Sequence, residues 1–198
     1  MTDFTLETGP DGIATITWDV KAKSMNVMSE EGFIELDGLI DSALADDAIK
    51  GIILTSGKDS FAAGMDLNVL AKMKEDGGDD PAASIFAGIM KIHATLRKIE
   101  RAGMDPKTLK GGKPIACVLP GTALGIGLEI PLSCHRIFAA DNPKAKIGLP
   151  EIMVGIFPGA GGTTRLVRKL GAMSASPFLL EGKSLAPAKA KAAGIIDE

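Results

Sequence analysis

Apolar and polar positions along the first sixty residues predict a strand, a helix and a second strand. Residues 13–18 (Ile-Ala-Thr-Ile-Thr-Trp) alternate at every second position, which is typical of a strand with one buried face. Residues 50–55 contain a short apolar run that predicts a buried strand. Between them, after the helix-capping residue Ser29, apolar side chains recur at helical spacing, at Phe33, Leu36, Ile40 and Ala43. This order favours an α/β fold with helices packed on a sheet.

The rest of the chain continues as apolar segments separated by loops. Residues 74–83 and 102–113 are rich in Gly, Pro and charged residues and predict loops. Pro131 lies in an apolar segment that reads as a helix, so we expect it either in the first turn or at a kink. The expected helices are 84–101, 124–134, 163–170 (ended by Gly171) and 186–194, and the expected strands are 114–119, 137–140 and 146–149.

The length, charge and composition of the chain indicate which kinds of protein and partner to expect. The 198 residues suffice for one domain with a real core, so we expect a single domain over 1–198. The net charge of −3 is spread along the chain and no basic stripe occurs, so neither nucleic acid nor a membrane surface is an expected partner. No apolar run is long enough to span a membrane and no signal peptide precedes the domain, so we expect a cytoplasmic location. Cys117 and Cys134 match no metal-ligand spacing and are expected to be free thiols.

Candidate chemistry lies in three glycine-containing segments. Residues 60–67 and 121–130 each place small residues before a probable helix start, where free backbone N–H groups and the helix dipole can stabilise an oxyanion. Glu129 stands about one turn into the second of these helices. In the third segment, Glu151 directly follows the end of a strand. Two carboxylates beside an oxyanion site would suit proton transfer next to a carbonyl group.

Simpler interpretations of the same residues stay open at this point. A glutamate in a first helical turn, such as Glu129, often only complements the helix dipole. Asp66 can be a cap or turn residue, and the glycines can serve turns alone. Residues 125–127 lack the third glycine of a dinucleotide fingerprint, and residues 158–162 lack the Lys-Ser/Thr of a phosphate-binding loop. The two histidines, His93 and His135, have no evident triad partner and are expected to be structural.

Taken together, these segments resemble, in order and spacing, the crotonase (enoyl-CoA hydratase/isomerase) superfamily. The run 134–136 (Cys-His-Arg) and the 22-residue step from Glu129 to Glu151 look like the hydratase domain of the multifunctional α subunit of the fatty-acid oxidation complex. The resemblance covers nearly the whole chain. It is carried by residues 26–28, 61–66, 121–129, 150–152 with 158–166, and 182–197.

The resemblance implies a fold and a set of site residues. The fold would be the crotonase (ClpP-like) fold of repeated ββα units, with the C-terminal helices truncated. Glu129 and Glu151 match the two catalytic glutamates, and the N–H groups of Met65 and Ile126 match the oxyanion hole. Lys23 is expected either near the CoA phosphates or simply in solvent. The other positions that match substrate contacts are Ala63, Gly64, Asp66 and Gly125.

The implied reaction adds water to a trans-2-enoyl-CoA to give a 3-hydroxyacyl-CoA, with some Δ3-Δ2 isomerisation. The acyl-CoA thioester is the substrate, and neither a metal nor a cofactor is expected. A pure isomerase, another crotonase-type acyl-CoA enzyme, or a protein that only binds CoA are the alternatives. The resemblance also implies that this is a fragment of a longer multifunctional protein without its dehydrogenase portion. The full-length protein is expected to form a trimer-type homo-oligomer or a complex with a thiolase subunit. Missing C-terminal helices would remove trimer contacts, so we expect weak turnover.

Two residues depart from the family pattern. Ile126 stands where the family usually has a glycine, and Pro120 replaces the usual asparagine before Gly121. The N–H of Ile126 is retained, but a β-branched residue would strain the backbone if φ were positive there. We therefore expect crowding or strain at Ile126 and a different turn at Pro120.

Overall fold

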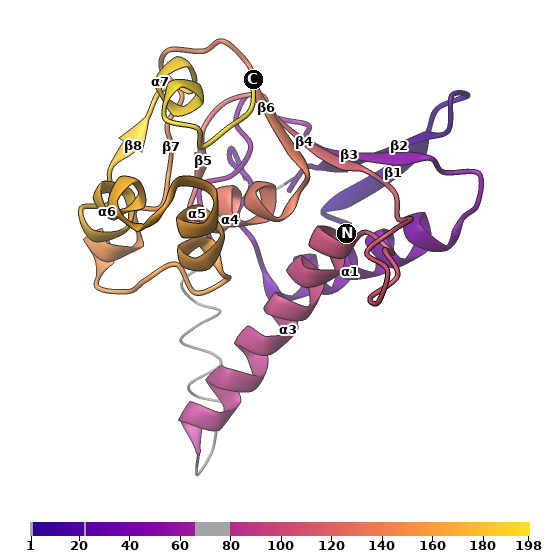
Figure 1. The fold of residues 1–198 in the computed structure, drawn as a ribbon, viewed down its shortest axis with the longest axis horizontal. Coiled ribbons are helices and arrows are strands. Elements are labelled where there is room, and N and C mark those ends of the chain that lie inside the picture. The colour runs from indigo at the N-terminus through magenta and orange to yellow at the C-terminus, as the bar shows by residue number, and fades with distance from the viewer. Residues whose placement is uncertain (1, 22, 66–79) are drawn as a thin grey trace.

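The structure is a computed structural model that describes residues 2–21, 23–65 and 80–198, and its largest feature is a five-stranded sheet (Figure 1). The strand order is β1-β2-β3-β4-β6, in which β1 is antiparallel to β2 and the others run parallel. The strands are β1 (Phe4–Thr8), β2 (Ile13–Trp18), β3 (Gly51–Ser56), β4 (Ile115–Leu119) and β6 (Arg136–Ala139).

A smaller sheet and four helices form the other half of the molecule. Strands β5 (Ala123–Leu124), β7 (Ile147–Gly148) and β8 (Ser184–Leu185) make the three-stranded sheet in the order β5-β7-β8. Around it gather the helices α4 (Ile126–Ser133), α5 (Gly162–Leu170), α6 (Ala172–Leu180) and α7 (Pro187–Ala192), at the left of Figure 1. The segment that links the two sheets leads through β5 into α4, so α4 begins where the two halves meet.

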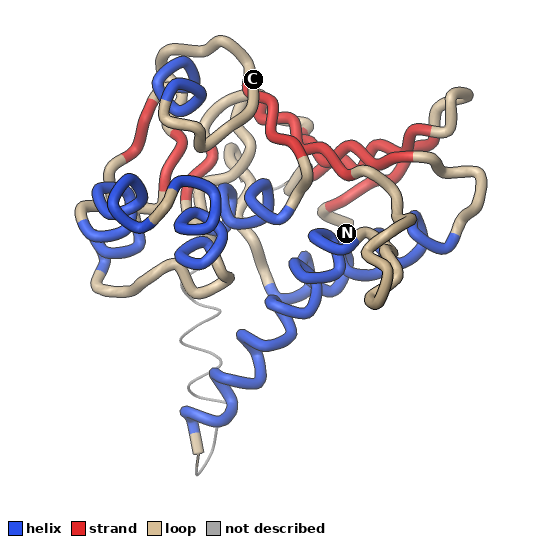
Figure 2. Tube along the Cα trace, viewed as in Figure 1, coloured by secondary structure: helices blue, strands red, loops and turns tan. Residues whose placement is uncertain are grey.

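Two longer helices lie on one side of the five-stranded sheet, below it in Figure 2. Helix α1 (Glu30–Ala45) begins at Ser29, whose hydroxyl accepts a hydrogen bond of 3.0 Å from the Gly32 N–H, as its sequence predicts. Helix α3 (Pro81–Arg101) begins three residues before the predicted start, because Asp80 caps the Ala83 N–H at 3.0 Å and Pro81 suits the first helical position. The loop predicted at 74–83 is therefore wrong for 81–83, Asp80 lies outside the helix as its cap, and residues 74–79 lie outside the described residues.

The other predicted strands and helices are confirmed to within about two residues at most ends. Pro131, however, lies in the second turn of α4, which ends only two residues later. Pro131 is therefore not in the first turn, its ring nitrogen carries no N–H for a backbone hydrogen bond, and the expected kink stays a prediction. The sequence patterns did not reveal β1, β5, β8, α6 or the 3-10 turn η1 (Glu151–Val154). Helix α6 contains Pro177, which masks its helical periodicity.

Trp18 anchors the core where the sheet meets the first glycine segment. Its ring stacks on Phe4 with centroids 5.4 Å apart and meets Phe61 edge-on at 5.8 Å. All three side chains are buried. The segment that starts at Phe61 is thereby held against the end of the sheet. Among the described residues, none of the helices has the length and apolar character needed to span a bilayer.

Candidate active site

Buried Asn26 holds the first glycine segment in place. Its side-chain amide donates to the carbonyl oxygens of Trp18 at 2.9 Å and Phe61 at 3.0 Å and to the Ser56 hydroxyl at 2.9 Å. Its Oδ1 accepts the Val20 N–H at 3.0 Å, and its backbone carbonyl accepts the Ala63 N–H at 2.9 Å. This one side chain satisfies groups from three separate segments, so it fixes how residues 61–65 leave the sheet.

The start of α4 is packed directly against the same segment. Leu124 donates its N–H to the Ala62 carbonyl at 3.1 Å, and Ala62 forms a parallel bridge with Ala123. A Cβ added to Gly127 would lie 2.8 Å from the Ala62 Cβ, so only glycine allows the helix to approach this closely. Residues 62–65 and the first turn of α4 are therefore neighbours in space.

The two N–H groups predicted to form an oxyanion hole each belong to a residue that directly follows a glycine. Among the described residues, neither Met65 nor Ile126 donates its backbone N–H to an acceptor. Gly64 (φ +118°) and Gly125 (φ +59°) precede them and take up the left-handed backbone conformations. The strain expected at Ile126 is absent, because Gly125 carries the positive φ and Ile126 is the first residue of α4.

A cavity of about 550 Å³ brings most of the predicted site residues together. Its wall also includes apolar side chains from α3 and from the turn after Glu151, so it is a mostly apolar chamber with two acidic groups. Asp66 lies outside the described residues. Lys23 is exposed and does not line this cavity. The predicted residues that do line it are Ala63, Gly64, Met65, Gly125, Ile126, Glu129 and Glu151.

Glu129 is almost completely buried, with only 3% of its surface exposed. Its Oε1 accepts a 2.8 Å hydrogen bond from the backbone N–H of Gly162 at the start of α5. A Cβ on Gly162 would lie 2.8 Å from the Glu129 Cγ, so a glycine is needed for this contact. The carboxylate is thus held by the backbone of a distant segment rather than by the dipole of its own helix alone.

Glu151 approaches the cavity from the other side, on η1. A Cβ built on Gly125 would lie 3.2 Å from Glu151 Oε1 and 3.6 Å from the Gly64 Cα, so these three residues converge near the first turn of α4. The second carboxylate oxygen, Oε2, is buried and has no hydrogen-bond partner among the described residues. A buried oxygen without a partner is costly, and the residue that carries it lines the chamber.

Burial shifts the protonation of both acids in the same direction. Burial, opposed by the Gly162 N–H and reinforced by the nearby Glu151 charge, raises the pKa of Glu129 from 4.5 to about 7. The Ala160 N–H and the Arg165 charge also oppose this rise. Burial likewise raises the pKa of Glu151. A carboxyl group with a pKa near 7 can both release and accept a proton at neutral pH.

Glu129 should make stability depend on pH in the neutral-acid range. Its pKa is higher in the folded protein, so the native state binds more protons than the unfolded chain between pH 4.5 and about 7, and the free energy of unfolding falls as pH rises through this window. At roughly 1.4 kcal/mol per pH unit the loss is at most about 3–4 kcal/mol. We expect the free energies of unfolding of wild type and Glu129→Gln, measured by urea titration, to be similar below pH 4.5. Above pH 4.5 the wild type should lose stability relative to the variant. A difference between them that did not change from pH 4.5 to 7 would contradict this prediction.

Sequence reasoning missed the groups that hold Glu129. Residues 158–166 were recognised as a motif, but no role was assigned to Ala160, Gly162 or Arg165. The signal available was the glycine pair before the helix at 162–170, because such a start presents free N–H groups. Nothing in the sequence indicated that those N–H groups would meet a carboxylate 33 positions earlier.

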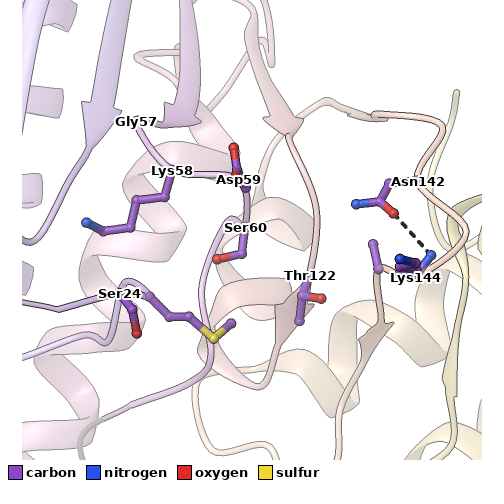
Figure 3. A pocket seen from close by; sticks show the side chains of 10 residues that line it. Ser24, Gly57, Lys58, Asp59, Ser60, Thr122, Asn142 and Lys144 are labelled. Atoms are coloured by element: carbon purple, nitrogen blue, oxygen red, sulfur yellow. Dashed lines mark hydrogen bonds between the residues drawn. The ribbon is translucent and has the colours of Figure 1, made fainter.

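A second concavity of about 500 Å³ is polar and shares no lining residue with the acidic cavity. Figure 3 shows its wall, with Lys58 and Lys144 on opposite sides. Lys58 pairs with Asp19 at 2.7 Å. Lys23 does not line this concavity either, although Ser24 and Met25 do. Its predicted contact with CoA phosphates stays a prediction.

The histidines and cysteines considered in the sequence analysis do not line the acidic cavity. His135 Nδ1 accepts the Ile115 N–H at 2.9 Å and helps to join β4 to the end of α4. His93 lies on α3 near Gly161, outside the lining of the acidic cavity. Cys117 and Cys134 are free. Within the described ranges, no cluster of three or more His, Cys, Asp or Glu side chains could hold a metal ion.

Known proteins resemble this chain in sequence and in fold. Residues 8–198 match the family model described as enoyl-CoA hydratase/isomerase. The fatty acid oxidation complex subunit alpha of Shewanella halifaxensis is 35% identical over 196 residues, which cover 98% of this chain and 26% of that protein, so the chain spans about a quarter of the length of the curated relatives it matches. A solved enoyl-CoA hydratase from Geobacillus kaustophilus is 31% identical with a TM-score of 0.83, and the match covers all of this chain and 67% of that one. One from Bacillus anthracis is 25% identical, also with a TM-score of 0.83, over 99% of this chain and 69% of that one.

Proposed function

The chain belongs to the enoyl-CoA hydratase/isomerase family, and from that premise we propose that it adds water across the double bond of a trans-2-enoyl-CoA. The crotonase fold expected from the sequence motifs is confirmed by the likeness to solved hydratases. The observation that carries the proposal is a cavity lined by one buried and one half-buried glutamate and by Met65 and Ile126, whose backbone N–H groups have no acceptor among the described residues.

The reaction follows from where each group lies. The thioester oxygen would accept hydrogen bonds from the N–H groups of Met65 and Ile126, which stabilise the enolate-like charge that develops on it. A preorganised donor of this kind contributes roughly 3 kcal/mol to transition-state stabilisation. The positive end of α4 adds to the same effect, since Ile126 is its first residue.

The two glutamates would hold the attacking water and move the protons. The water oxygen forms a bond to C3 as a carboxylate takes one of its protons, and C2 receives a proton as the enolate collapses to the 3-hydroxyacyl thioester. Glu151 lines the cavity, and its carboxylate would accept a hydrogen bond from that water. Glu129, with a pKa of about 7, can carry a proton at neutral pH. A buried pair is needed because one group must give a proton while the other takes one.

The apolar remainder of the cavity suits an acyl chain. Ile89 and Ile92 of α3 line one wall, and Ile156 and Phe157 line the wall beyond η1. Apolar walls around a few polar groups are the usual composition of a site for a largely apolar ligand. Within this proposal the CoA portion leaves the cavity past Ala63 and Gly64, and no cofactor takes part.

The relatives suggest a wider setting for the activity. We propose that the whole protein works in fatty-acid β-oxidation in the cytoplasm, as a homo-oligomer or in a complex with a thiolase subunit. The multi-subunit name of the curated relatives and their greater length support this proposal.

A substrate panel tests the proposed reaction. Purified protein is incubated with trans-2-enoyl-CoA thioesters of several chain lengths and with a 3-enoyl-CoA, and the loss of the conjugated enoyl absorbance and the products are followed. We expect 3-hydroxyacyl-CoA from the trans-2 substrates. Conversion of the 3-enoyl substrate alone would replace hydration with isomerisation. Acyl-CoA binding by calorimetry without any product would reduce the protein to a CoA-binding member of the family.

A further inference from the structure

Arg165 is buried beneath the acidic cavity without touching it. The residue stands on α5, and its side chain is only 10% exposed. It does not line the cavity. Its guanidinium donates to the Ala160 carbonyl at 3.0 Å and reaches Glu100 on α3 at 3.4 Å. The arginine thus connects two segments, α3 and the stretch that contains Ala160, which both contribute residues to the cavity wall.

The ion pair between Arg165 and Glu100 does not by itself explain why the guanidinium is buried. Its 3.4 Å contact with Glu100 is long for a charge-assisted hydrogen bond. Its Nε is buried and finds no acceptor among the described residues. Glu100 is shared with Arg97, its closer partner. Taking a guanidinium out of water costs several kcal/mol, and such imperfect pairing recovers only part of that cost.

Arg165 instead lies against the loop whose backbone binds the Glu129 carboxylate. Its own N–H bonds to the Gly161 carbonyl at 3.0 Å, while its side chain bonds to the Ala160 carbonyl. A Cβ on Gly161 would lie 2.5 Å from Arg165 Nη1, so the guanidinium passes directly over this glycine. The next residue is Gly162, whose N–H binds the Glu129 carboxylate. The arginine therefore binds the carbonyl groups of Ala160 and Gly161, the two residues directly before Gly162.

We propose that Arg165 is a positioning residue, which clamps the Ala160–Gly162 backbone and so holds the Glu129 carboxylate in the orientation that proton transfer requires. Its positive charge favours the ionised form of Glu129 and so opposes the rise in the pKa of that carboxyl group. Glu100 keeps the guanidinium in place from α3. The proposal rests on the proposed function for its kinetic consequence, but the structural effect on Glu129 does not depend on the reaction.

The charged and titratable groups of this clamp come from four elements, α3, α4, η1 and α5. Glu129 is faced by Glu151 of η1 and by Arg165 of α5. Arg165 is faced by Glu100 of α3, and His93 of α3 lies near Gly161. Burial would raise the pKa of Glu100, but its hydrogen bond to Arg97 and the Arg165 charge hold that pKa below its usual range. Glu100 is therefore an anion at neutral pH, as a counter-ion must be.

The test compares Arg165→Met with Arg168→Met, an exposed arginine on the same helix. Two quantities are measured: steady-state hydration from pH 5 to 9, and the titration of Glu129 by carboxyl NMR or infrared difference against Glu129→Gln. We expect Arg165→Met to lower kcat by about 10–100-fold with KM within about twofold, as misplacement of a reacting group does. The titration midpoint of Glu129 should rise, because an attractive charge is removed. Arg168→Met should change neither.

Arg165→Lys separates charge from geometry and protects the test against misfolding. A lysine keeps the charge but lacks the rigid fork that spans Ala160 and Glu100. We expect its Glu129 midpoint to stay near the wild-type value while kcat remains several-fold low. If Arg165→Met fails to fold, this variant decides, and a wild-type kcat in Arg165→Lys overturns the proposal. A folded Arg165→Met with wild-type kcat and wild-type Glu129 titration also overturns it. If the wild type hydrates nothing, the proposed function fails, and a midpoint that rises in Arg165→Met but not in Arg168→Met still shows that Arg165 acts on Glu129.

Discussion

Replacing Glu129 or Glu151 with glutamine is expected to lower kcat for hydration of a trans-2-enoyl-CoA by about 10²–10⁴-fold in each case. Glutamine has nearly the same shape as glutamate, and its side-chain oxygen can still accept the Gly162 N–H that now binds Glu129. The substitution removes the ability to give or take a proton and little else. Stopped-flow or steady-state assays of enoyl-CoA loss measure the effect.

The matched control is Glu181→Gln, an exposed glutamate that follows α6. Its kcat should equal that of the wild type, and circular dichroism should show all three variants folded. Binding of a saturated acyl-CoA should persist in Glu129→Gln and Glu151→Gln, because the N–H groups of Met65 and Ile126 remain. Hydration within threefold of wild type in either cavity variant would remove that glutamate from the proposed mechanism.

Asn26→Leu is expected to be the most destabilising single substitution near the site. Leucine fills a similar volume but offers no hydrogen bond to the Val20 N–H, the Trp18 and Phe61 carbonyls or the Ser56 hydroxyl. Each buried polar group left without a partner costs about 1–3 kcal/mol, so the free energy of unfolding should fall by at least about 3 kcal/mol. That is a large share of the roughly 5–15 kcal/mol typical of a domain. Equilibrium urea unfolding measures the change.

The comparison for this variant is Asn142→Leu. Asn142 makes an exposed hydrogen bond, from the Lys144 N–H to its Oδ1 at 3.1 Å, so its loss should cost less than about 1 kcal/mol. Asn26→Leu should also slow hydration under conditions where it is still folded, since the segment that carries Met65 would lose its anchor. Equal losses of stability in the two variants would show that Asn26 is not the anchor of residues 61–65.

Much of the fold was predictable because many of its helices and strands follow from patterns among neighbouring residues. The alternation over 13–18 and the helical spacing after Ser29 depend only on neighbouring residues, and both elements appear where expected. Helix α6 and strand β1 were not predicted. In α6 an internal proline interrupts the pattern, and its stability comes from packing against neighbours such as α5. Strand β1 is an edge strand whose exposed positions dilute the apolar signal.

The sequence by itself determined which residue types stand in the glycine segments, the order of Glu129 and Glu151, and the resemblance to a family. Only the tertiary structure decided that these segments share one cavity, that Gly125 rather than Ile126 carries the unusual backbone angle, and that Gly162 holds Glu129. The reason is physical. Secondary structure follows from short-range periodicity, whereas burial, the resulting rise in the pKa of Glu129 and the reach of Arg165 depend on contacts between residues more than thirty positions apart.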